Sequence, residues 1–104
     1  MEKEARSMRI RGFLNSIESS DEPFTELSVE LRALWWAKKG AWEKAHDLAQ
    51  EAGTKEGDWV HAYLHRVEGD LSNASYWYAR AGKPVSSIEL SKEWNEIVRA
   101  LFDL

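Results

Sequence analysis

Residues 57–82 read GDWVHAYLHRVEGDLSNASYWYARAG, and this stretch repeats residues 28–53 at a shift of 29 positions without a gap. The two stretches share small residues at matching places. The matching pairs are Ala33 and Ala62, Gly40 and Gly69, Ala45 and Ala74, Ala52 and Ala81, and Gly53 and Gly82. A repeat of this size is typical of stacked helical hairpins. The sequence therefore predicts an all-α fold, in which antiparallel helical hairpins stack as a short right-handed α–α superhelix of about six helices.

Composition limits the classes of partner. The chain has 104 residues, no cysteine and a formal net charge of −4. This length corresponds to one domain that can bury a core, and without cysteine there are neither disulfides nor thiolate metal ligands. The acidic balance argues against nucleic acid, because phosphate binding needs a basic face. Since no secretion signal and no stretch of roughly 20 apolar residues is present, we expect a cytoplasmic protein without a membrane partner.

Apolar residues recur at helical spacing along the whole chain. The spacing predicts six helices, at about residues 3–19, 25–39, 41–52, 57–68, 71–81 and 86–103. The first and last have no copy at the 29-residue shift, which suits the end caps of a repeat array. We therefore divide the single domain, residues 1–104, into four parts. These are an N-terminal capping helix (1–20), a first hairpin (25–54), a second hairpin (55–84) and a C-terminal capping helix (86–104).

Particular residue types mark the helix ends. The four glycines of the repeat stand where a left-handed residue ends a helix. Asp70 suits the N-cap of the helix that follows it. Ser86 and Glu89 fit a capping box at the start of the last helix.

The order of small and large residues resembles the tetratricopeptide repeat. In each copy a small residue (Ala33, Ala62) precedes the turn glycine, and a large apolar residue (Trp42, Leu71) follows it. The second copy, in NASYWYARAG at residues 73–82, is similar to the second helix of Sel-type variants of that repeat. The resemblance covers about residues 27–84, and the period of 29 residues departs from the family's usual ~34. Residues 59–74 are also similar to small helical proteins of bacteria, a resemblance that implies no activity.

The tetratricopeptide resemblance implies a partner-binding groove. In that family the first helix of each hairpin lines a concave surface, which corresponds here to Leu34 in the first copy and to Trp59, Tyr63 and Arg66 in the second. Lys38 adds a charge for a carboxylate. Aromatic residues and arginine are common anchors of peptide sites. The leading hypothesis is a non-catalytic interaction or scaffold module that binds a peptide, a partner helix or a second copy of itself.

An alternative for the groove is that the C-terminal helix packs into it and buries these aromatic side chains. The six tryptophans of the chain leave the same two interpretations open. They are either large core residues between small-residue helices, or one or two of them line a binding surface.

His61 and His65 stand four residues apart on one predicted helix, a spacing that can hold a metal ion. A third ligand could be His46, Asp47 or Glu68. The metalloprotease form needs a glutamate directly after the first histidine, where this chain has alanine. The second hypothesis is therefore a small metal- or ligand-binding helical protein that uses His61 and His65. The alternative is that the two histidines have no ligand and form hydrogen bonds to a neighbouring helix.

The sequence contains no motif of nucleophilic catalysis and no phosphate-binding glycine loop. We therefore expect no enzymatic activity and no cofactor. The third functional hypothesis is a self-associating structural domain.

Overall fold

The computed structural model describes residues 2–104, with side chains from residue 5 onward. Over these residues the protein is all-α, with six helices and no strand. The helices are α1 (Glu2–Ser19), α2 (Val29–Lys38), α3 (Trp42–Ala52), α4 (Lys55–Glu68), α5 (Leu71–Ala81) and α6 (Leu90–Phe102). The predicted fold class and number of helices are confirmed. Among the helices of this described part, none combines the length and the apolar character that crossing a bilayer requires.

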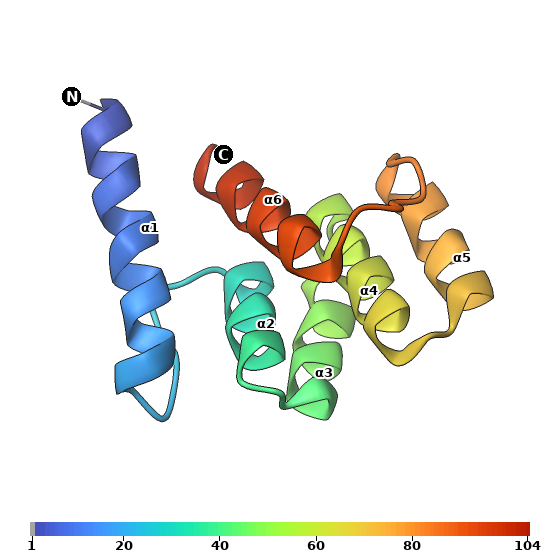
Figure 1. Cartoon of the computed structure of the whole chain (residues 1–104), viewed down its shortest axis with the longest axis horizontal. Coiled ribbons are helices and arrows are strands. Elements are labelled where there is room, and N and C mark those ends of the chain that lie inside the picture. Colours follow the sequence, from blue (N-terminus) through green and yellow to red (C-terminus); the bar gives the residue numbers. More distant parts are fainter. Residues whose placement is uncertain (1) are drawn as a thin grey trace.

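The four central helices form two hairpins. α2 packs chiefly against α3 and α4 against α5, and the pairing of α3 with α4 joins the hairpins. In Figure 1, α2 to α5 follow one another across the molecule, with α1 at one end. α6 returns over this row and contacts both α2 and α4.

The 29-residue repeat is visible in the helix bounds and in the turns. α3 and α5 have the same length, and the bounds of α5 are those of α3 shifted by 29 residues. The φ angles also match, at 84° for Gly40 and 85° for Gly69, and at 64° for Gly53 and 71° for Gly82. These positive φ angles favour glycine, which has no Cβ to clash. The left-handed glycines predicted from the sequence are confirmed.

Side-chain caps set the starts of three helices. The Ser28 hydroxyl accepts a hydrogen bond of 3.2 Å from the backbone N–H of Leu31, so α2 begins at residue 29 rather than 25. Thr54 caps α4 in the same way, so this helix begins two residues before its predicted start. Asp70 caps α5, as predicted.

The predicted capping box at the start of the last helix is wrong. α6 begins at Leu90, and Glu89 is its N-cap residue without a side-chain hydrogen bond. Ser86 lies in the connection before the helix, where its hydroxyl accepts a hydrogen bond of 3.4 Å from Arg66 of α4. A contact with a distant helix has replaced the local one.

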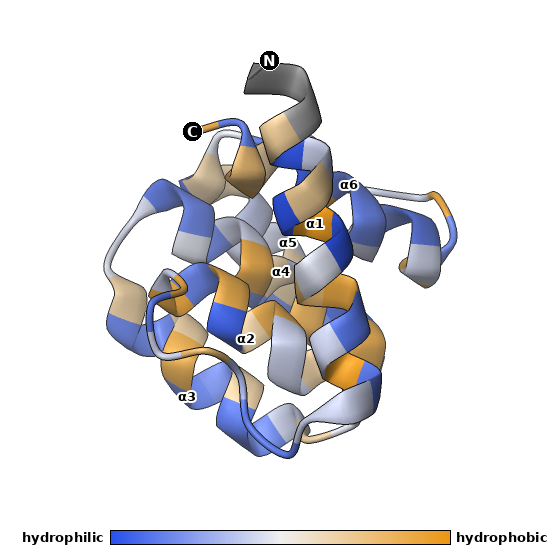
Figure 2. Ribbon diagram, turned by 90° about the vertical axis from the view of Figure 1, so that its left-hand side faces the viewer, coloured by the Kyte–Doolittle hydropathy of each residue, from blue (hydrophilic) through white to orange (hydrophobic). Residues whose placement is uncertain are grey.

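Small residues let the helices of the core approach closely. Ala33, Ala45 and Ala62 are fully buried. At Gly57 in α4 a Cβ atom would lie 2.6 Å from the Cβ of Ala52 in α3, so glycine is required at this crossing. In Figure 2 the hydrophobic segments of α1, α2 and α4 lie toward the middle of the view.

Large aromatic side chains connect α1 and α6 to the hairpins. The rings of Phe13 in α1 and Trp94 in α6 stack at 6.1 Å between centroids, and both side chains are buried. The indole N–H of Trp35 in α2 donates a hydrogen bond of 2.9 Å to the hydroxyl of Ser16 in α1. These contacts place three of the chain's large rings in one core.

Candidate functional site

The groove predicted for a partner is filled by α6. Trp59 and Tyr63 are each 7% exposed and Leu34 is fully buried. The expectation that these side chains line a groove open to a partner is therefore wrong. The physical reason is the apolar face of α6, formed by Trp94, Ile97, Val98 and Leu101, all of which are buried. The alternative, that the C-terminal helix packs into the groove, is confirmed.

Arg66 binds α6 instead of a partner's carboxylate. Its guanidinium donates a hydrogen bond of 2.6 Å to Glu93, and a second of 2.5 Å to the backbone carbonyl of Ile88. Glu93 also accepts a hydrogen bond of 2.5 Å from the hydroxyl of Tyr78 in α5. Burial opposes the charge of Arg66, but its hydrogen bond to Glu93 and the charge of Glu93 outweigh this effect and raise its pKa.

The remaining predicted contact residues face the same C-terminal segment. The backbone carbonyl of Leu34 accepts a hydrogen bond of 2.9 Å from the indole of Trp94, and the ammonium of Lys38 lies 4.9 Å from the centre of that ring. The ring of Trp59 is covered by Lys83, whose ammonium lies 4.2 Å from the ring centre. Four of the five residues predicted to bind a partner thus contact the chain's own residues 83–102, and these are Leu34, Lys38, Trp59 and Arg66. The fifth, Tyr63, is buried.

The second predicted site is a cluster of histidines between the hairpins. The chain has three histidines, and all three converge: His46 from α3 and His61 and His65 from α4. Each can offer a ring nitrogen, and the three ligand atoms lie within 4.8 Å of one another. His61 and His65 are buried and His46 is half-buried. The i, i+4 spacing places the two α4 side chains on one face, which is the face that α3 covers.

Two close polar contacts organise the cluster. The Nε2 atoms of His46 and His61 lie 2.9 Å apart, a distance at which one ring donates a hydrogen bond to the other. The Nδ1–H of His65 donates a hydrogen bond of 2.6 Å to the carboxylate of Glu68. When Nδ1 carries the single proton of a neutral imidazole, the other nitrogen, Nε2, is the one that can act as a ligand.

Two tryptophans enclose the histidines. The ring of Trp77 from α5 stacks on His61 at 3.8 Å between centroids, and the ring of Trp42 stacks on His46 at 4.8 Å. Trp42 is fixed by its indole N–H, which donates a hydrogen bond of 2.8 Å to the carbonyl of Leu64. Both tryptophans are half-buried, so each forms a wall between the cluster and solvent. Of the two interpretations that the sequence left open for the tryptophans, the core interpretation holds for Trp35, Trp59 and Trp94, whereas Trp42 and Trp77 are partly buried and pack against the core.

The environment holds His61 in its neutral form. Burial lowers the pKa of His61 to about 4, and the charges of His46, His65 and Arg80 act in the same direction. Its Nδ1 atom is buried without a hydrogen-bond partner among the described residues. A buried polar atom without a partner lowers the stability of a fold.

The sequence supplied two members of the cluster and left the third open. The structure brings His46 to the other two histidines, whereas Glu68 lies behind His65 as its hydrogen-bond acceptor. Asp47 is exposed on α3 and does not belong to the cluster. A second group of potential ligand atoms comprises His65, Glu68 and Asp70, but both carboxylates are exposed. The sequence signal that favours His46 is its position on the helix before the one that carries His61 and His65. Only the packing of α3 on α4 brings His46 close to that pair.

Comparisons with protein-family models, with curated proteins and with solved structures found no match. The resemblance to tetratricopeptide repeats therefore stays a prediction.

Proposed function

We propose that this protein binds one divalent transition-metal ion, zinc in the first place, through His46, His61 and His65. The single observation that supports this proposal is that all three histidines of the chain converge at one partly buried site between α3 and α4. Imidazole nitrogen is a preferred ligand of zinc, copper and nickel. The interaction hypothesis requires an open groove, which α6 occupies, so metal binding takes precedence over it.

The distance between His46 and His61 fits a metal after a small movement. A tetrahedral zinc ion at about 2.0–2.1 Å from two nitrogens holds them roughly 3.3–3.4 Å apart. His46 and His61 face each other with their Nε2 atoms at 2.9 Å, so they need to separate by about half an ångström. His46 is half-buried, which leaves room for this movement. The metal would take the place of the proton that the two rings share.

Glu68 supplies the support that metal-bound histidines commonly have. A carboxylate that accepts the hydrogen bond of the second ring nitrogen fixes the orientation of the ring and raises its basicity. The Glu68–His65 contact of 2.6 Å has this geometry. Three nitrogen ligands leave a fourth position of a tetrahedral ion for water or another small ligand.

The test is metal binding by untagged protein, measured by isothermal titration calorimetry and by metal analysis after dialysis. We expect one zinc ion per chain, and His46→Gln is expected to weaken binding by more than about 100-fold. Glu68→Gln should weaken it by about 10- to 100-fold, because it removes only the orienting carboxylate. Asp47→Asn, on the neighbouring position of α3, is the matched control and should leave the affinity unchanged.

Two results would refute the proposal. One is the absence of stoichiometric binding of zinc, copper and nickel by the folded chain. The other is binding that survives His46→Gln but is lost in Asp47→Asn, which would move the metal to a carboxylate site. Cobalt(II) gives a check that needs no variant, because three-nitrogen tetrahedral coordination predicts intense visible absorption bands.

A further inference from the structure

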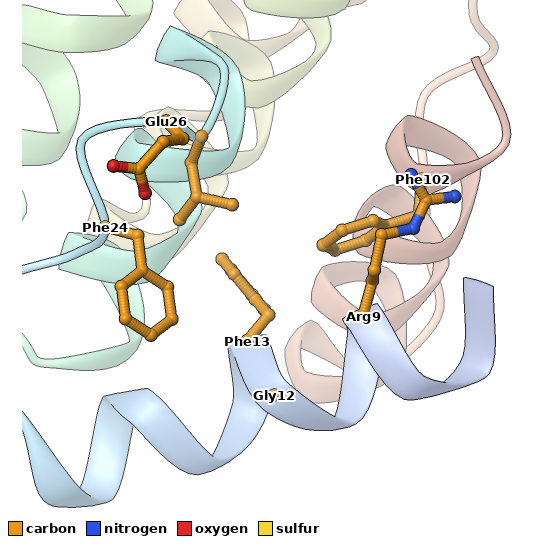
Figure 3. Close-up of a pocket in the computed structure, with 7 residues that line it drawn as sticks. Arg9, Gly12, Phe13, Phe24, Glu26 and Phe102 are labelled. Atoms are coloured by element: carbon orange, nitrogen blue, oxygen red, sulfur yellow. The ribbon is translucent and has the colours of Figure 1, made fainter. Parts of the chain in front are cut away.

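A small apolar pocket opens between α1, the connection at residues 20–28 and α6. Its volume is about 290 Å³, and Phe13, Phe24, Leu27 and Phe102 form its apolar walls. Figure 3 shows Phe24 on one side and Phe102 on the other, with Phe13 and Gly12 of α1 between them. This volume is just below the range of about 300–1,000 Å³ for pockets that hold drug-sized ligands, so the pocket suits one ring or a short hydrocarbon chain.

Gly12 forms part of this pocket, and the fold does not explain it. The chain has six glycines, of which four have positive φ angles and a fifth, Gly57, is required by the close crossing with Ala52. Gly12 has neither property, and a Cβ atom built there meets nothing within 4 Å. Glycine in the interior of a helix weakens the helix relative to alanine. A residue that costs stability and leaves space at the lining of a pocket indicates that the space is used.

The charges at the pocket differ between its two sides. Arg9 lies three residues before Gly12 and so on the same face of α1. In Figure 3 it stands beside Phe102, while Glu26 stands beside Phe24 on the other side. Among residues 5–104, Arg9 has no ion pair, whereas Glu26 accepts a hydrogen bond of 3.1 Å from the hydroxyl of Thr25. An anion is therefore attracted to the Arg9 side and repelled from the Glu26 side.

We infer that this pocket binds a small anionic amphiphile, namely a carboxylate with one aromatic ring or a short acyl chain. The hydrocarbon part lies against Phe13, Phe24 and Leu27 above Gly12, and the carboxylate pairs with the Arg9 guanidinium. No residue of α3 or α4 lines the pocket, so this inference is independent of the metal proposal.

The test uses the full-length protein and three ligands that differ only in their head group: 4-phenylbutyrate, 4-phenylbutan-1-ol and 4-phenylbutan-1-amine. Binding is followed by amide chemical shifts in two-dimensional NMR. We expect saturable binding of the carboxylate with a dissociation constant on the order of 1 mM or lower, with the largest shifts around Gly12. The alcohol should bind roughly fivefold more weakly, and the amine more weakly still.

Three variants locate the site. Gly12→Leu fills the pocket and should abolish binding of all three ligands while raising the midpoint of thermal unfolding. Arg9→Gln should reduce the affinity for the carboxylate to that for the alcohol. Arg11→Gln, on the same helix and outside the pocket lining, is the control and should have no effect. Phe24→Ser, which removes a wall from the exposed connection, tests the same pocket if Gly12→Leu does not fold.

Each contrary result overturns the inference. No saturable binding, or unchanged binding in both Gly12→Leu and Phe24→Ser, removes the pocket as the site. Equal binding of alcohol and carboxylate, or strongest binding of the amine, removes Arg9 as the determinant of the ligand class.

Discussion

Glu93 is 1% exposed, yet its carboxylate is not an isolated buried charge. It accepts hydrogen bonds from Arg66 of α4 and Tyr78 of α5, so this one residue connects α6 to both helices of the second hairpin. A buried ion pair of this kind gives little net stability over an apolar contact, but removing one member leaves the other unpaired. The sequence does not predict this role, because a charged residue such as Glu93 among the apolar residues of α6 has the pattern of an exposed position.

Glu93→Ala is expected to lower the free energy of unfolding by about 3–5 kcal/mol, since it leaves the Arg66 guanidinium and the Tyr78 hydroxyl without their acceptor. Urea unfolding monitored by circular dichroism measures this change. Glu96→Ala, at an exposed position of the same helix, is the matched control and should change the value by less than about 0.5 kcal/mol. Equal effects of the two substitutions would mean that the network does not hold α6.

For the helices, the sequence predicts the features that neighbouring residues determine. It does not predict contacts between residues that are far apart in the chain. The bounds of α3 and α5 and the positive φ of Gly40 and Gly69 follow from neighbouring residues, so the repeat pattern predicts them. The occupant of the groove depends on contacts such as the one between Trp94 and Leu34, which are 60 residues apart. The resemblance to tetratricopeptide repeats implied a set of groove residues, and the sequence left open whether a partner or the chain itself covers them.

The docking of α6 predicts a loss of stability at alkaline pH. Burial, with the nearby charge of Glu93, raises the pKa of Tyr63 from 10.0 to about 12, and burial also raises the pKa of Tyr78. Because the folded state holds these protons more tightly than the unfolded chain, their contribution is complete below pH 10 and is lost as the pH rises toward 12. At pH 11 the titration of Tyr63 alone should lower the free energy of unfolding by about 1.4 kcal/mol.

Denaturant unfolding between pH 8 and pH 11 measures this loss. Tyr63→Phe removes one of the two tyrosines whose pKa is raised, so the free energy of unfolding should depend less on pH. A stability that stays constant up to pH 11 would contradict the buried environment of Tyr63.

At the scale of the whole molecule, the histidine cluster lies where the two hairpins meet. His46 belongs to the first hairpin and His61 and His65 to the second, so a bound metal would join α3 to α4. The sequence predicted the pair on α4 from its spacing, but left His46, Asp47 and Glu68 as equal choices for the third ligand. Only the packing between the hairpins distinguishes these three candidates. The spacing of residues within a single helix does not predict that packing.

A metal that binds only the folded state stabilises it. At a free zinc concentration about 100 times the dissociation constant, the expected gain is about 2.7 kcal/mol, which corresponds to a rise of roughly 12 °C in the unfolding midpoint. Thermal unfolding with zinc and then with a chelator measures this shift and its reversal. Magnesium and calcium prefer oxygen ligands and should have no effect. A zinc-induced shift that persists in His46→Gln would contradict the joining of the hairpins.

X-ray absorption at the zinc edge of the loaded protein examines the coordination most directly. We predict three imidazole nitrogens at about 2.0 Å, with the imidazole contribution reduced to two rings in His46→Gln. A first shell of oxygen atoms with one imidazole or none would contradict the proposed three-histidine centre.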